Sequence, residues 1–344
     1  MEGRPGPDDP GRGRKDLSAG ADTPLFSIGV TTYDRVELLR ETLASILRQD
    51  FRDFEILVGN DNPARRLDAS LLNAADPRVR IVNRPANLGE LGNMNALLAE
   101  ARGRYFSWLA DDDLYACGIL SAVAAAVAEF GGPSCVYTLY TSLQAPAAAR
   151  QAPTRRVEAA EFLRAYLARR LPVLGCCGFY ERAALLDLGG MTPLGPGISP
   201  YSDNLLALRS ALLRPVVIDQ PLIHFRLHEQ SLSYSSVDLA AYRVAQESLW
   251  SRFARDILPL ADVPSGQRGP LLSALLSWCV RDFFGIMGRS GRGDASEMRS
   301  YMRFLHKALP ESGGLTSRAA MVTFAELVKL PLRVAASRAL PKSA

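Results

Sequence analysis

Residues 105–113 read Tyr-Phe-Ser-Trp-Leu-Ala-Asp-Asp-Asp, an apolar run that stops on three adjacent carboxylates. Its length and aromatic content predict a buried strand, which would hold the carboxylates at a strand end. Neighbouring carboxylates repel one another, and burying them is costly without a cation. Mg²⁺ and Mn²⁺ accept such oxygens and keep positions for substrate phosphates. An acidic cap for the following helix is an equally good interpretation of this stretch alone.

Short apolar segments alternate with segments of helical periodicity on both sides of this stretch. The alternation predicts βαβ units and a mainly parallel sheet flanked by helices. Ligands bind outside the carboxyl ends of the strands in such sheets, and two polar clusters, residues 60–63 and 111–113, fall at such ends. The predicted strands are residues 25–31, 54–58, 79–82, 105–109 and 135–140, and the predicted helices are residues 36–47, 91–101 and 114–130.

The chain divides into three predicted parts. Residues 1–22 are rich in Gly, Pro, Asp and Arg and lack aromatic residues, which is typical of a disordered tail. Residues 23–236 form the α/β domain. Its second half has predicted helices at 159–169 and 203–213 and extended segments at 173–180 and 222–227. Residues 237–344 form a helical C-terminal region, interrupted between Pro259 and Pro270.

Composition limits the function classes. The 344 residues are 48% hydrophobic and 22% charged, enough for a full core. Forty basic against 36 acidic residues give a net charge of +4, too mild to predict a nucleic-acid binder. The five cysteines form no CxxC pair, which favours reduced thiols in a cytoplasmic protein. No apolar run approaches the ~20 residues that span a bilayer.

Several motifs resemble family 2 glycosyltransferases of the GT-A fold, a Rossmann-like α/β architecture. The resemblance extends from about Pro24 to His228 and rests on the order and spacing of its pieces. These are Ser-Ile-Gly-Val-Thr-Thr-Tyr-Asp-Arg (27–35), Ser45 with Gln49, Phe-Glu-Ile-Leu-Val-Gly-Asn-Asp (54–61), Asn-Leu-Gly (87–89) with Asn95, Ala-Arg-Gly-Arg-Tyr (101–105), and Trp-Leu-Ala-Asp-Asp-Asp (108–113), which resembles the metal-binding DxD motif.

The resemblance implies roles for residues of the first half. Asp112 is the expected main ligand of a divalent cation, Mg²⁺ or Mn²⁺, with Asp113 as ligand or support. A register in which Asp111 and Asp113 bind the metal stays open. Asp61, taken alone, is better explained by an Asx-type turn before Pro63. The residues expected to bind the nucleotide-sugar donor are Thr31, Tyr33, Arg35, Asp61, Arg84 (at the diphosphate) and Asp111 (at the ribose or sugar).

Two later segments extend the resemblance. Ser-Asp-Asn-Leu-Leu-Ala-Leu-Arg (202–209) resembles the segment whose Asp is the general base of inverting members, here Asp203, although Ser202 replaces the usual Glu. A helix N-cap is the competing interpretation of Asp203. Phe-Arg-Leu-His (225–228) resembles a segment that closes the site, and His228 is either a metal or phosphate ligand or a structural histidine. Gly178 with Phe179 resembles the glycine loop on the acceptor side.

The expected function is therefore metal-dependent, inverting transfer of a sugar from a nucleoside-diphosphate donor, UDP- or dTDP-linked, to a glycan or lipid-linked acceptor in cell-surface or secreted glycan synthesis. A non-catalytic module that binds nucleotide or a protein partner is the alternative, because Asn60, Ala110 and Ser202 replace acidic residues usual in the family. A nucleotidyltransferase would need a Gly-rich basic loop that residues 31–34 do not supply.

Residues 318–342 carry five basic residues and one acidic residue among apolar ones. Such a stretch can lie on an anionic membrane surface, which would place a cytoplasmic protein at the inner membrane face. A helix docked on its own domain explains the same pattern.

Overall fold

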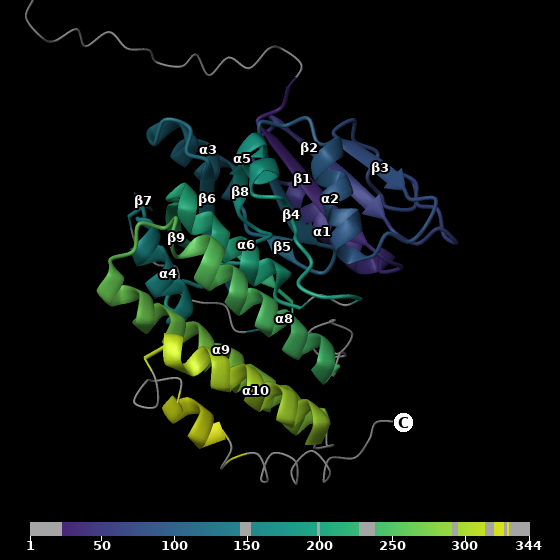
Figure 1. The fold of residues 1–344 in the computed structure, drawn as a ribbon. Coiled ribbons are helices and arrows are strands. Elements are labelled where there is room, and N and C mark those ends of the chain that lie inside the picture. Colours follow the sequence, from purple (N-terminus) through teal and green to yellow (C-terminus); the bar gives the residue numbers. More distant parts are fainter. Residues whose placement is uncertain are drawn as a thin grey trace, which may run out of the picture.

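The computed structural model describes residues 23–144, 153–197, 200–226, 238–290, 295–313, 320–326 and 329. It shows a sheet flanked by helices and, against it, a helical C-terminal region (Figure 1). The predicted tail (1–22), His228 and most of residues 318–342 lie outside the described residues.

The first half forms the predicted parallel strands. They are β1 (Phe26–Thr32), β2 (Phe54–Asn60), β3 (Val79–Asn83) and β4 (Tyr105–Ala110), adjacent in the order β3-β2-β1-β4. Thr31 of β1 is paired with Gly59 of β2 and with Ala110 of β4. Because this register aligns the carboxyl ends of the three strands, Asp61 and Asp111 leave the sheet at the same edge.

The two faces of the sheet are covered by different helices. Ile28, Val30, Ile56 and Val58 share a core with α1 (Val36–Leu47) and α3 (Ile119–Glu129). On the opposite face Leu57, Phe106 and Trp108 pack with α2 (Glu90–Glu100), α4 (Ala159–Leu167) and α6 (Ser202–Ser210). Side chains alternate between faces along a strand, which separates the two cores.

The second half of the sheet is mixed. Strand β8 (Phe179–Glu181) lies between β4 and β6 (Cys135–Ser142) and is antiparallel to both. Strand β9 (Val216–Phe225) is parallel to β6 and pairs antiparallel with β5 (Leu114–Tyr115) and β7 (Arg155–Arg156). Within the described residues the sheet has nine strands, eight of them in the order β3-β2-β1-β4-β8-β6-β9-β5. The parallel arrangement thus holds on the β1–β4 side and for β6 with β9.

Three predicted elements differ from the structure. Residues 114–130 were predicted as one helix, but residues 114 and 115 pair with β9, and α3 begins only after Gly118, whose φ of +79° suits glycine. Strand β9 begins six residues before the predicted 222 and contains Pro221, next to a register irregularity against β6 that accommodates a residue without a donor. Of the predicted extended segment 173–180, only the end joins a strand, β8.

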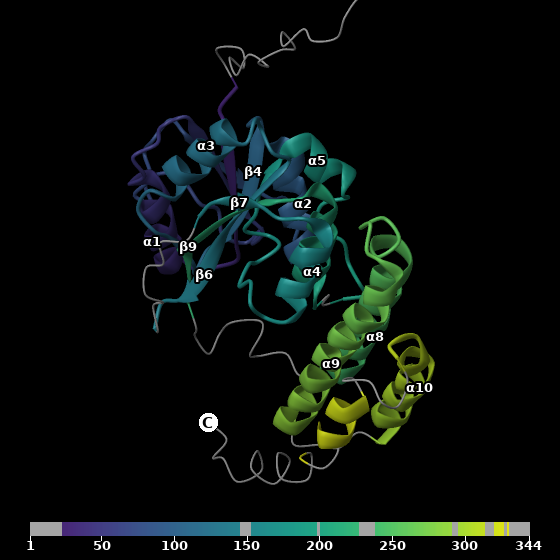
Figure 2. The same cartoon turned by 90° about the vertical axis from the view of Figure 1, so that its left-hand side faces the viewer.

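The C-terminal region packs on the α4–α6 face of the sheet (Figure 2). It contains α8 (Leu239–Arg252), a π-helical turn η2 (Phe253–Ile257), α9 (Ser265–Ser290) and α10 (Ala295–Glu311). Short helices α5 (Arg182–Asp187) and η1 (Ala211–Leu213) complete the connections. The predicted interruption is present before Ser265, and α9 then continues through Pro270.

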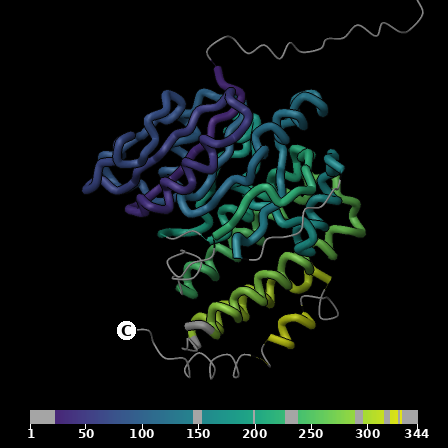
Figure 3. The backbone as a smooth tube through the Cα atoms, turned by 180° about the vertical axis from the view of Figure 1, so that it is seen from behind, coloured from purple at the N-terminus to yellow at the C-terminus, as the bar shows by residue number. Residues whose placement is uncertain are grey.

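One helix among the described residues, spanning Ser265–Gly288, has the length and apolar composition that a membrane span requires. Most of it is buried inside the protein, because α9 packs against α4, α8 and α10. Figure 3 shows the C-terminal helices from behind, in green to yellow, as a layer beside the rest of the molecule. The apolar character of α9 is therefore explained by its place in the core.

Candidate active site

The turn after β2 is fixed by Asn60 and Asp61. The Asn60 amide donates to the Arg65 carbonyl at 2.7 Å and to Asn83 Oδ1 at 2.8 Å, while its own Oδ1 accepts from the Asn62 N–H. The Asx-type turn expected of Asp61 is thus formed by Asn60. Asp61, which is buried, accepts a hydrogen bond from the Leu88 N–H at 2.8 Å and so ties the loop before α2 to the sheet edge.

The turn after β4 holds the three aspartates. Asp111 is fully buried, and Asp112 and Asp113 are nearly so. Thr42 of α1 donates to the Asp113 carbonyl at 2.8 Å, and the Arg226 N–H donates to Asp113 Oδ1 at 3.0 Å. Helix α3 has Gly118 as its N-cap, so the aspartates do not cap it. The helix-cap interpretation is therefore wrong, and these two hydrogen bonds tie Asp113 to α1 and to Arg226, the residue after β9.

Arg35 lies against the other two aspartates. Its guanidinium forms an ion pair with Asp111 and a second with Asp112 at 2.9 Å. Its neighbour Tyr33 is about half exposed, and Thr31 is partly buried at the end of β1. The resemblance implied that Arg35 contacts the nucleotide; in the structure its guanidinium contacts the two carboxylates.

Two hydrogen bonds in series, called the relay below, connect β4 through the backbone of Cys176 to the Asp203 side chain and place Asp203 near the same edge. The Trp108 N–H of β4 donates to the Cys176 carbonyl at 3.0 Å, and the Cys176 N–H donates to Asp203 Oδ1 at 2.6 Å. Gly175 makes this approach feasible, since a Cβ there would lie 2.2 Å from the Asp203 carbonyl oxygen. Tyr201, not Asp203, is the N-cap of α6. The N-cap interpretation of Asp203 is therefore wrong.

Glu90 is a site residue that sequence reasoning missed. It is the first residue of α2 and is exposed to solvent, but its carboxyl group lies near enough to the site for partial loss of hydration and the negative charges of Asp203, Asp112 and Asp111 to raise its pKa. Glu90 thus lies close enough to Asp203 on one side and to Asp111 and Asp112 on the other to feel the charge of each. The available signal was its position directly after Asn-Leu-Gly (87–89), one of the segments that carry the family resemblance.

Burial shifts the proton affinity of these acids. It raises the pKa of Asp111 to about 6 and that of Asp113 to about 7. Burial also raises the pKa of Asp203, against the hydrogen bond from the Cys176 N–H. Shifted carboxyl groups gathered at one sheet edge are typical of catalytic sites.

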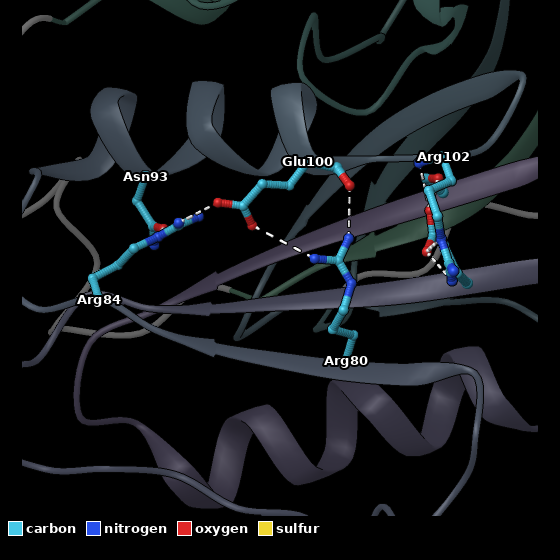
Figure 4. A network of polar contacts seen from close by, with 7 residues as sticks. Arg80, Arg84, Asn93, Glu100 and Arg102 are labelled. Carbon is cyan, nitrogen blue, oxygen red and sulfur yellow. Dashed lines mark hydrogen bonds and ion pairs between the residues drawn. The ribbon is translucent and has the colours of Figure 1, made fainter.

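Arg84 follows β3, and its backbone N–H donates to the Asn60 carbonyl at the end of β2 at 2.9 Å. Its side chain is buried under α2, where it forms an ion pair with Glu100 and donates to Asn93 Oδ1 at 3.0 Å (Figure 4). The Glu100 carboxylate also forms a longer ion pair with the Arg80 guanidinium, at 3.8 Å. These contacts hold α2 on the sheet, and none of them is to the three aspartates, so the diphosphate contact of Arg84 stays a prediction.

The donor set fits a divalent cation that is shared with a substrate. Among the described residues no three Asp, Glu, His or Cys side chains converge as a closed metal site. Both Asp111 carboxylate oxygens are buried with no hydrogen bond of good geometry, and the ion pair with Arg35 supplies the positive charge on which this carboxylate depends. Mg²⁺ and Mn²⁺ are commonly held by one or two carboxylates together with substrate phosphates, which this edge could supply through Asp111 and Asp112.

A family model described as glycosyl transferase family 2 matches residues 27–182, which include Arg35, Asp61 and the three aspartates. Residues 27–182 belong to glycosyltransferase family 2. This matched segment, called the family 2 domain below, begins in β1 and ends where α5 starts. Asp203 and the C-terminal helices come after it in the chain.

Curated relatives of the family 2 domain include two bacterial enzymes. The GalNAc(5)-diNAcBac-PP-undecaprenol beta-1,3-glucosyltransferase of Campylobacter jejuni is 35% identical over 103 residues, covering 29% of this chain and 33% of that one. The UDP-Glc:alpha-D-GlcNAc-diphosphoundecaprenol beta-1,3-glucosyltransferase WfgD of Escherichia coli is 27% identical over 94 residues, covering 27% and 37%. The matches span about a third of the length of these relatives.

The fold likeness extends beyond the family 2 domain. The structure of S. aureus TarS 1–349 in complex with UDP-GlcNAc superposes with a TM-score of 0.63 at 16% identity, covering 91% of this chain and 90% of that one. TarS 1–349 alone gives 0.64. The predicted GT-A type α/β fold with a helical C-terminal region is thereby confirmed.

Proposed function

We propose that this protein is a cation-dependent, inverting glycosyltransferase that moves a sugar from a nucleoside-diphosphate donor to an acceptor hydroxyl. The observation that carries the proposal is the relay from Trp108 through Cys176 to Asp203. It holds a carboxylate of raised pKa beside the strand that ends on Asp111 and Asp112. Family membership supports the reaction class.

Asp203 is the proposed general base. It takes the proton of the acceptor hydroxyl while the acceptor oxygen bonds to the anomeric carbon and the bond from that carbon to the diphosphate oxygen breaks. Attack opposite the leaving group inverts the anomeric centre. A base is most effective when its pKa lies near the working pH, and burial moves the pKa of Asp203 in that direction.

Asp111 and Asp112 are the proposed holders of the cation. When bound, a divalent cation supplies the positive charge that stabilises the departing diphosphate. Asp113 keeps these two carboxylates in place through its contact with the Arg226 N–H.

Thr31, Tyr33 and Asp61 are the proposed nucleotide contacts, because they lie at the ends of β1 and β2 beside Asp111. The exposed Tyr33 ring offers a stacking surface for a base. A UDP-linked donor is favoured over a dTDP-linked one, since TarS is seen with UDP-GlcNAc and the name of WfgD specifies UDP-Glc.

The proposed acceptor is a lipid-linked glycan, as in the names of the two glucosyltransferase relatives. Contact with a membrane would follow, and the described part of the C-terminal stretch supports it. In residues 320–326, Met321 and Phe324 are 63% and 71% exposed, while Thr323 and Glu326 face inward. We place the enzyme in the cytoplasm, peripheral at the inner membrane face.

The test is turnover of UDP-glucose and of UDP-N-acetylglucosamine, measured as the release of UDP with and without Mn²⁺. Slow hydrolysis of either donor also excludes the non-catalytic alternative. Asp203→Asn keeps the shape of the side chain but cannot take a proton, so turnover should fall at least ~100-fold while UDP binding persists. Asp187→Asn, on the exposed surface of α5, is the matched control. Wild-type turnover in Asp203→Asn would remove Asp203 as the base.

A further inference from the structure

Arg35 is placed where it competes for the proposed cation ligands. It follows β1 directly before α1, and its guanidinium reaches two separate carboxylates, Asp111 and Asp112. Asp111 has no exposed surface, and among the described residues Arg35 is the only basic ion-pair partner found for it. The guanidinium thus balances a buried charge that would otherwise be costly.

The loop allows the Arg35 side chain to move while its backbone stays fixed. Asp34, the preceding residue, has a φ of +63° and pairs with Arg65 at 2.5 Å, which anchors the backbone. The Arg35 side chain itself is 30% exposed and has several rotatable bonds. It can therefore leave the carboxylates without unfolding the turn.

A guanidinium and a divalent cation held by the same two carboxylates repel each other, because both are positive. A cation that arrives alone therefore competes with Arg35 for Asp111 and Asp112, and each weakens the binding of the other. A cation that arrives with a diphosphate brings two or more negative charges, and guanidinium groups bind phosphate oxygens in bidentate fashion.

We infer that Arg35 is an internal counter-ion that occupies Asp111 and Asp112 in the empty enzyme and transfers to the donor diphosphate when the cation binds. Cation and donor then bind cooperatively, and the free enzyme has little affinity for the cation alone. This inference rests on the proposed function, since it assumes that the two carboxylates hold the cation. Arg35 acts as a positioning residue in the empty enzyme and contacts the donor only in the loaded one.

The experiment is calorimetric titration of the full-length protein with Mn²⁺, in the absence and presence of UDP, at about pH 8 where carboxyl groups are ionised. Arg35→Gln removes the internal cation. The variant should bind Mn²⁺ alone about fivefold or more tightly than the wild type, and the gain in Mn²⁺ affinity caused by UDP should shrink by a similar factor. Arg155→Gln, which removes an exposed arginine that pairs with Glu161 and has no part in the Arg35 loop, should behave as the wild type.

The outcomes separate the two proposals. If the wild type binds Mn²⁺ with UDP but Arg35→Gln binds Mn²⁺ alone no more tightly than the wild type, the role of Arg35 is overturned and the proposed function stands. If the wild type does not bind Mn²⁺ even with UDP, both fall. Should Arg35→Gln fail to fold, Arg35→Lys keeps one positive charge but cannot bridge both carboxylates. It should show a smaller gain in the same direction, and no gain would overturn the inference.

Discussion

At the scale of single residues, the site depends on where buried carboxylates find their positive charge. Asp111 relies on Arg35, whereas Glu55 of β2, which is also buried, relies on Arg102. The first pair lies at the carboxyl edge, where a ligand can replace the arginine. The second lies at the opposite end of the sheet, so its contribution is to stability alone.

Glu55→Gln should reveal that contribution. Glu55 accepts from the Ser27 hydroxyl at 2.6 Å and from the Arg102 N–H at 2.7 Å, beside an ion pair with the Arg102 guanidinium. Burial acts to raise the pKa of Glu55, but these hydrogen bonds outweigh it and lower the pKa below the ordinary 4.5. The variant should lose ~1–3 kcal/mol of unfolding free energy at neutral pH, measured by urea denaturation.

The sign of the pH dependence follows from the lowered pKa. A carboxyl group whose pKa is lower in the folded state stabilises the fold above its unfolded pKa and loses that effect as the pH falls through the folded value. The difference between Glu55→Gln and the wild type should therefore shrink as the pH drops below about 4.5. Glu161→Gln, which breaks the exposed pair with Arg155, should cost at most about 1 kcal/mol. A constant difference down to the acid range would contradict this account.

At the scale of elements, Gly175 and Cys176 lie between strand β4 and helix α6. Cys176 is hydrogen-bonded to both, and Gly175 packs against the α6 backbone. Sequence patterns predicted an extended segment here and assigned importance to Gly178, but the close backbone approach to α6 occurs at Gly175. A glycine that permits tertiary contact between distant segments has no local signature, which is why this role required the structure.

Gly175→Ala should displace the general base. The added Cβ would meet backbone atoms of α6, 2.2 Å from the Asp203 carbonyl oxygen and 2.7 Å from the Ala207 nitrogen, and neither can move alone. We expect turnover to fall by at least ~10-fold with the affinity for UDP nearly unchanged, because the nucleotide contacts lie on β1 and β2.

The matched control for Gly175→Ala is Gly266→Ala in the first turn of α9, where a Cβ meets no atom within 4 Å. That variant should keep wild-type turnover and gain slightly in stability, since alanine favours helix. Equal turnover in the two variants would show that the α6 approach does not position Asp203.

At the scale of the whole molecule, the family 2 domain and the C-terminal helices share one core. Phe106 and Trp108 of the sheet belong to the same buried cluster as Leu205 of α6 and Phe283 of α9. The C-terminal helices are thus part of the globule that supports Asp203.

Membrane contact is the property of the whole molecule that can be tested directly. The full-length protein should co-sediment with vesicles that contain anionic lipid, and a truncation before Arg318 should lose most of that binding, because the exposed Met321 and Phe324 and the basic residues of 318–342 are removed. Leu260→Ser, which removes an apolar side chain exposed elsewhere, is the control and should bind like the wild type. Equal sedimentation of truncated and full-length protein would remove the membrane contact from the proposal.

The sequence by itself determined the strands of the parallel β1–β4 half of the sheet, the helices α1 and α2 and the edge at which Asp61 and Asp111 emerge. These features follow from apolar periodicity and from the order of strands, both of which are local. Only the tertiary structure decided that β5 pairs with β9, that Arg35 pairs with the aspartates while Arg84 pairs with Glu100, and that Glu90 and Asp203 approach the same edge. Each of these depends on contacts between residues far apart in the chain, and the partner of a charged side chain is set by packing that no short stretch of sequence encodes.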